Sequence, residues 1–113
     1  MAKKKIDQNE VNEIAILLRG KLDAKAKQRI AEFSSRTGIN HYSGTIVMVG
    51  ASKPGTDQHI TFSDAASGQS TGSIWPDWAA DLAENAFFGD RDVLIFASGD
   101  PVGKNIETVY VVN

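Results

Sequence analysis

The feature that most constrains this sequence is an amphipathic segment that leads within a few residues into an unbroken apolar run. Trp78, Leu82 and Ala86 recur at helical spacing. Pro76 precedes them, and proline suits the first turn of a helix because its missing N–H would have no partner there. The run Val93–Ala97 lacks polar alternation and includes β-branched residues, so it predicts a strand covered on both faces. This helix and strand must pack closely, and they form the predicted core.

The other face of the predicted helix is acidic. Asp77, Asp81 and Glu84 follow one another at helical spacing, so their carboxylates share one face. We expect a solvated face, and the alternative is contact with the basic N-terminal segment, within one chain or between two. Gly89 predicts the end of this helix, because glycine adopts the left-handed conformation at little cost.

Helical patterns also precede the strands. Asp7 stands three residues ahead of a glutamate and predicts an N-cap, after which an apolar stripe runs for about two turns. Gly20 interrupts this stripe, and Asp23 predicts the cap of a second helix that ends at Gly38. The alternative is one bent helix over residues 8–36, with the internal glycine tolerated at a cost of about 1 kcal/mol.

Three further segments predict strands. Thr45–Val49 lacks alternation, as Val93–Ala97 does, and is therefore expected at the centre of the sheet. His59–Phe62 alternates polar and apolar residues, which is typical of a strand with one face in water. The last strand is Ile106–Val112, and the turn-rich residues 98–105 before it predict an antiparallel hairpin with Val93–Ala97.

The connections complete the predicted order. Residues 39–44 are expected to form a connector, and residues 50–57 an exposed loop. Residues 63–73 predict a hairpin turn and a short strand that reaches Ile74. The fold class is therefore α+β: an antiparallel or mixed sheet of four to five strands, with two N-terminal helices and one inserted amphipathic helix packed on it.

Length and composition indicate an ordinary globular chain. With 113 residues, 42% of them hydrophobic and 23% charged, we expect a single domain over residues 7–113 after a flexible basic tail at residues 1–6. No apolar run approaches the roughly 20 residues that span a bilayer. The absence of cysteine excludes disulfides, thiolate metal sites and a cysteine nucleophile. These features favour a cytoplasmic protein without membrane contact.

Charge is divided unevenly along the chain. Residues 1–37 contain nine Lys and Arg against five Asp and Glu, whereas residues 38–113 contain three against nine. The basic part is a candidate for contact with nucleic acid, but the chain as a whole has a net charge of −2, which makes that partner unlikely. The candidate residues for this contact are Lys3, Lys4, Lys5, Lys25 and Arg29.

No motif predicts a catalytic residue, a metal or a cofactor. The segment Gly99–Asn105 differs from a phosphate-binding P-loop, because three residues separate its glycines where four are required and a strand follows it. The histidines His41 and His59 lie in different segments, and neither has a partner that the sequence can identify for metal binding or acid–base chemistry.

A candidate ligand site surrounds the serine- and glycine-rich segment at residues 63–75. Trp78 matches the apolar stripe of the helix and is expected in the core. Trp75 is expected either at the lip of a ligand site or as a staple at the entry to the helix. With them, His59 and Asp64 make up the candidate ligand-binding residues.

Three hypotheses of function follow. The leading one is a small non-enzymatic protein-interaction module that associates with itself, because Ile106–Val112 is long and apolar and invites pairing if it lies at a sheet edge. The first alternative is a ligand-binding domain or small enzyme that uses the segment at residues 63–75. The second alternative is nucleic-acid binding through the basic N-terminal helices, which salt would weaken steeply.

Overall fold

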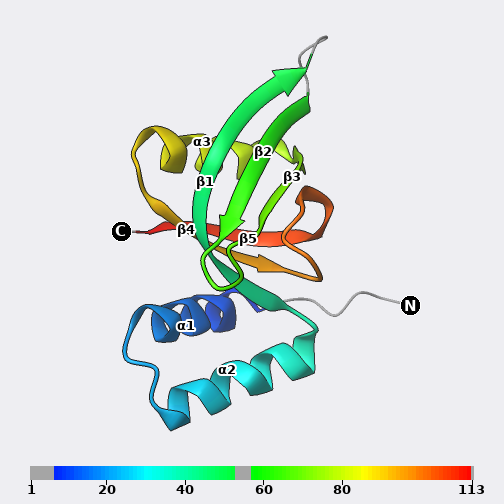
Figure 1. Cartoon of the computed structure of the whole chain (residues 1–113). Coiled ribbons are helices and arrows are strands. Elements are labelled where there is room, and N and C mark those ends of the chain that lie inside the picture. The colour runs from blue at the N-terminus through cyan, green and yellow to red at the C-terminus, as the bar shows by residue number, and fades with distance from the viewer. Residues whose placement is uncertain (1–6, 53–56, 113) are drawn as a thin grey trace, which may run out of the picture. The chain divides into compact units, whose positions relative to one another are not determined.

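The computed structural model describes residues 7–52 and 57–112, so the predicted basic tail lies outside the described residues. Within them it contains three α-helices and one five-stranded antiparallel sheet, which confirms the α+β class (Figure 1). The chain divides into two compact units, one ending at Ile39 and the other beginning at Asn40. None of the helices in the described part of the chain is long and apolar enough to cross a membrane.

The first unit is a helical hairpin of α1, Gln8–Arg19, and α2, Ala24–Thr37. Two helices form instead of one bent helix, and each starts at an aspartate. The carboxylates of Asp7 and Asp23 accept hydrogen bonds from backbone N–H groups of the first turn, at 2.9 and 2.8 Å. Gly38 ends α2 in the left-handed conformation, with φ of 73°. The predicted caps of both helices are therefore confirmed.

The second unit is built on the sheet, in which every neighbouring pair of strands is antiparallel. The strand order is β3-β2-β1-β4-β5, so the first three strands form a meander and the last two form a hairpin on its other side. The strands are β1, Asn40–Ser52; β2, Asp57–Asp64; β3, Ser70–Trp75; β4, Asp92–Ala97; and β5, Ile106–Val112.

Strand β1 is central, as predicted, but it is longer than its apolar run. Its first part, Asn40–Thr45, pairs with β4, and its second part, Gly44–Ser52, pairs with β2. Figure 1 shows it as a long curved strand shared by the two halves of the sheet. The prediction of a connector at residues 39–44 is therefore wrong from Asn40 onward, because pairing with β4 overrides the turn-like composition of that segment.

A register shift in β1 opens part of its outer face. The shift lies between Ile46 and Met48 in the pairing with β2. Ile46 points into the core, whereas Val47 and Met48 have 47% and 63% of their surface exposed. The apolar run of β1, which has no polar alternation, thus indicates a central strand. It does not indicate a strand that is covered on both faces.

Helix α3, Asp77–Phe88, packs on the sheet through a face of alanines. Small side chains bring the helix close to the strands, where it shares one core with Val93 and Ile95 of β4, as predicted. The helix ends before Gly89 as expected, but Gly89 keeps a right-handed φ of −89°, and the positive φ of 52° occurs at Asp90. The alanines of this face are Ala79, Ala80, Ala83 and Ala86.

Candidate functional site

The last strand lies at an edge of the sheet, which is the condition on which the hypothesis of self-association depends. Strand β5 pairs with β4 on one side, and no other strand of the described chain pairs with its second side. Its sequence, IETVYVV, contains β-branched and aromatic residues, no glycine or proline, and a single charged residue, Glu107. Lysines, proline and bulges are the usual features that protect an edge strand from pairing. The one register shift in the β4–β5 ladder lies at its start, beside Ala97.

The opposite edge, β3, is shorter and carries Gly72 in its middle. A 3-10 helix, Gly103–Asn105, lies against its end. The N–H of Gly103 donates a hydrogen bond to Ser73 Oγ at 3.0 Å, and a Cβ at position 103 would come within 1.7 Å of the carbonyl oxygen of Ile74. The two edges of the sheet therefore differ, because β3 is covered near its end by the connection that leads into β5.

Ser73 joins β3 to the 3-10 helix at this place. Its hydroxyl oxygen accepts hydrogen bonds from Trp75 Nε1 at 3.1 Å and from the N–H of Gly103 at 3.0 Å. Trp75 is only 2% exposed, so this contact satisfies the polar atom of a buried indole. No sequence pattern points to Ser73, and the composition of residues 98–105 indicates only a turn at Gly103. Their roles depend on contacts between segments about thirty positions apart.

A shallow depression of about 590 Å³ opens beside this junction. Its apolar lining includes Ile74, Trp78 and Ile106, and two of these side chains are largely open to solvent, with exposed fractions of 49% for Ile74 and 50% for Trp78. Asp77 and Lys104 lie at its rim and are both exposed. The depression thus presents an apolar centre with one charge of each sign.

The predicted environment of Trp78 is wrong. Trp75 lies in the core, where its backbone pairs with Gln58 of β2, and this burial fits a packed staple at the entry to the helix and not the lip of a ligand site. Trp78 was expected in the core and is half exposed. The pairing extends β3 to Trp75 and turns that side chain inward, whereas the face of α3 that lies in the core consists of alanines and does not include Trp78.

The other two candidate ligand residues lie apart. His59 is exposed on the outer face of β2, in register with Gly50 and Ile74. Asp64 stands at the other end of β2, roughly 17 Å away at the spacing of an extended strand. Its carboxylate accepts hydrogen bonds from the N–H of Ala66 at 3.0 Å and from the hydroxyl of Ser67 at 3.1 Å, which fixes the turn before β3. The structure does not bring Asp64 to the tryptophans.

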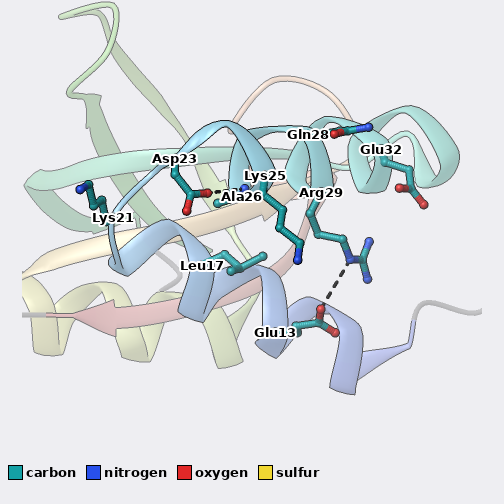
Figure 2. Close-up of a pocket in the computed structure, with 9 residues that line it drawn as sticks. All are labelled: Glu13, Leu17, Lys21, Asp23, Lys25, Ala26, Gln28, Arg29 and Glu32. Carbon is teal, nitrogen blue, oxygen red and sulfur yellow. Dashed lines mark hydrogen bonds and ion pairs between the residues drawn. The ribbon is translucent and has the colours of Figure 1, made fainter.

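A groove runs along the helical hairpin, as Figure 2 shows. Arg29, a candidate for phosphate contact, instead donates to Glu10 at 2.8 Å and forms an ion pair with Glu13 at 3.5 Å. Arg36 also donates to Glu10. The groove is lined by three basic and three acidic side chains around Leu17 and Ala26: Lys21, Lys25, Arg29, Glu13, Asp23 and Glu32.

The ion pairs shift the titration of the groups that they join. Hydrogen bonds from Arg36 and Arg29 lower the pKa of Glu10 from 4.5 to about 2. The contact with Glu10 raises the pKa of both arginines. Arg29 is therefore paired within the hairpin, and the lining of the groove is balanced in charge. Lys25 is exposed, whereas Lys3, Lys4 and Lys5 lie outside the described residues.

Comparison with known proteins adds no family. No protein-family model matches the chain, and the search of curated proteins gives no significant match. In residues 7–52 and 57–112, no group of three or more His, Cys, Asp or Glu side chains is arranged to hold a metal ion.

Proposed function

We propose that the chain is a non-enzymatic protein-interaction module in which two copies associate through β5. The observation that carries this proposal is the position of β5 at the edge of the sheet. A strand at an edge has N–H and C=O groups directed away from its neighbour, and a second strand can pair with them. The other edge is a poorer candidate, since β3 is short, contains Gly72 and is covered near its end by Gly103.

Two-fold symmetry suits this strand. In an antiparallel pair centred on Val109, the middle residue of β5, Thr108 lies opposite Tyr110 of the second copy, and Glu107, at the register shift that begins the strand, lies near Val111. The two glutamates then stand apart, and every other cross-strand pair joins uncharged side chains. Cross-strand pairs of β-branched and aromatic residues stabilise such a ladder, whereas like charges directly opposite would weaken it. The result would be one continuous sheet of ten strands.

Sedimentation velocity tests the proposal. We expect the wild-type protein to shift from monomer to dimer as its concentration rises from about 1 µM to about 1 mM. The double variant Thr108→Lys/Val112→Lys should remain monomeric over the same range, because lysines on an edge strand oppose pairing. Both positions are half-buried, so circular dichroism must show that the variant keeps its fold.

The matched control places a lysine on the other edge. Ser70 is exposed at the start of β3, and Ser70→Lys should dimerise as the wild type does. A wild-type protein that remains monomeric at the highest concentration would overturn the proposal. So would a folded double variant on β5 that dimerises with unchanged affinity.

A further inference from the structure

We infer that the outward side of α3 binds a lysine-rich segment of a partner protein. The surface in question, the α3 outer face, consists of Trp78, Asp81, Glu84, Asn85 and Phe88. It contains no residue of β5, so the inference goes beyond the proposed function and does not depend on it.

The first argument is the exposure of two aromatic rings on one side of the helix. The residues of the α3 outer face recur at intervals of three or four positions, so they form one stripe along α3. The alanines of α3 occupy the side that packs in the core. On the outer stripe, Trp78 is 50% exposed and Phe88 is 77% exposed. Large rings gathered on one exposed stripe are typical of a surface that a partner covers.

The second argument is charge, which decides the chemistry of that partner. Helix α3 contains no lysine or arginine, and Asp77 adds a third carboxylate one turn before Asp81. Within residues 7–52 and 57–112, neither Asp81 nor Glu84 forms an ion pair. A cation is attracted both by a carboxylate and by the face of an aromatic ring. A purely apolar partner would instead remove carboxylates from water without compensation.

The third argument is a hollow that suits a lysine side chain. Its volume is about 320 Å³, and its lining is Asp81, Glu84, Asn85 and Phe88. The ring of Phe87 packs edge-on against that of Phe88, with their centres 5.2 Å apart, and Asn85 Nδ2 donates a hydrogen bond to the carbonyl oxygen of Asp81 at 3.3 Å. Lysine joins an apolar stem to a charged end, so its stem can lie along the ring while its ammonium group meets the carboxylates.

The length of the face indicates a segment and not a single side chain. Trp78 and Phe88 are separated by a rise of about 15 Å along the helix, which an extended segment of about five residues spans. Lysines at alternate positions of an extended segment lie about 7 Å apart on one side. The rise between Asp77 and Asp81 is about 6 Å. Alternate lysines can therefore pair with successive carboxylates.

Tryptophan fluorescence tests the inference with hexalysine as the probe. Trp78 is half exposed and Trp75 is buried, so a peptide on the α3 outer face changes the emission of Trp78. At about 1 µM protein, where the proposed dimer does not form, we expect a saturable change that weakens as salt rises. In Trp78→Phe the change should disappear.

Neutralising the carboxylates measures the contribution of charge. The double variant Asp81→Asn/Glu84→Gln should raise the dissociation constant for hexalysine about tenfold. The matched control is Asp92→Asn/Asp100→Asn, which removes the same number of charges from two exposed residues outside α3. This control should stay within about twofold of the wild-type value.

Removing one ring measures the contribution of the aromatic surface. Phe88→Ala should weaken binding about threefold, the usual size of an exposed contact between a cation and a ring. The control is Met48→Ala on β1, which truncates another apolar side chain that is 63% exposed. It should leave the dissociation constant unchanged.

Three results would overturn the inference. The first is the absence of binding at low salt, and the second is an equal effect of the two charge variants, which would mean that hexalysine responds only to the net charge of the chain. The third is tighter binding of hexalysine when Lys3, Lys4 and Lys5 are replaced by alanine, because the chain's own lysines would then compete for the face. None of these results would affect the proposal of dimerisation through β5, which sedimentation tests separately.

Discussion

The helical hairpin and the sheet unit use different interactions to join segments that are distant in sequence. In the hairpin, Glu10 of α1 binds Arg29 and Arg36 of α2 through charged contacts on a partly exposed surface. In the sheet unit, an apolar core and the neutral hydrogen bonds of Ser73 join β3, α3 and the start of β5. We therefore expect the stability of the sheet unit to respond to steric change, and the stability of the hairpin to respond to pH and salt.

The largest effect is expected from Gly103→Ala in the sheet unit. A Cβ there would lie 1.7 Å from the carbonyl oxygen of Ile74, so the 3-10 helix or β3 must move. We expect a loss of about 3 kcal/mol in the free energy of unfolding. Denaturant unfolding followed by tryptophan fluorescence measures it, because both tryptophans belong to the sheet unit.

Gly50→Ala is the matched control for that substitution. A Cβ at position 50 has no atom within 4 Å, so the free energy of unfolding should change by less than about 0.5 kcal/mol. If the two alanine variants are equally stable, close contact between the 3-10 helix and β3 does not limit the stability of the sheet unit. The expected steric sensitivity of the sheet unit would then be wrong.

A smaller effect is expected from Ser73→Ala. This change removes the hydroxyl oxygen that accepts hydrogen bonds from Trp75 Nε1 and from the N–H of Gly103. The buried Nε1 of Trp75 would lose its partner. An unsatisfied buried donor costs about 1–3 kcal/mol, so we expect a loss of about 2 kcal/mol. The exposed neighbour Ser70 on the same strand serves as the control, since Ser70→Ala should be close to neutral. A neutral Ser73→Ala would show that water replaces the hydroxyl.

The sequence predicts the helices and strands better than it predicts the contact between β3 and the 3-10 helix at Ser73. Local signals located the helix caps at Asp7 and Asp23 and the strand β4, because capping and apolar runs act over a few residues. The environment of Trp78 is predicted wrongly, because the face of α3 that packs in the core begins one residue later, at Ala79.

The candidate site was predictable only in part. The sequence predicts the long apolar strand at residues 106–112 but not its place in the sheet, which the strand order puts at an edge. The depression beside it depends on Gly103 meeting Ile74 across the sheet unit, and neither composition nor periodicity carries that information. Asp64 looked like a possible ligand residue for a similar reason: its partners in the turn, Ala66 and Ser67, become visible only in the folded chain.

In the hairpin, acid is expected to cause a loss of about 1 kcal/mol. The pKa of Glu10 falls from 4.5 to about 2 on folding, so the ionised carboxylate favours the folded state. This contribution is complete above pH 4.5 and is lost as the pH falls toward about 2. The contact is partly exposed, which limits its size. Unfolding followed by far-ultraviolet circular dichroism in the wild type and in Glu10→Gln measures the difference. The variant should be less stable at neutral pH, and the gap should close in acid.

The smallest expected effect is the response of that gap to salt. At about 1 M salt the Debye length is about 3 Å, so the Coulombic attraction of Glu10 for Arg29 and Arg36 is screened. The hydrogen bond between Glu10 and Arg29, at 2.8 Å, is a direct contact that salt weakens less. We therefore expect salt to reduce the difference between wild type and Glu10→Gln at neutral pH by less than about 0.5 kcal/mol. The same salt should leave the cost of Ser73→Ala unchanged, because that hydroxyl and its donors carry no charge. If salt changes the stability of the two variants equally, both units unfold as one and share the same electrostatic contribution. This result would contradict the expected difference between a charge-dependent hairpin and an uncharged sheet unit.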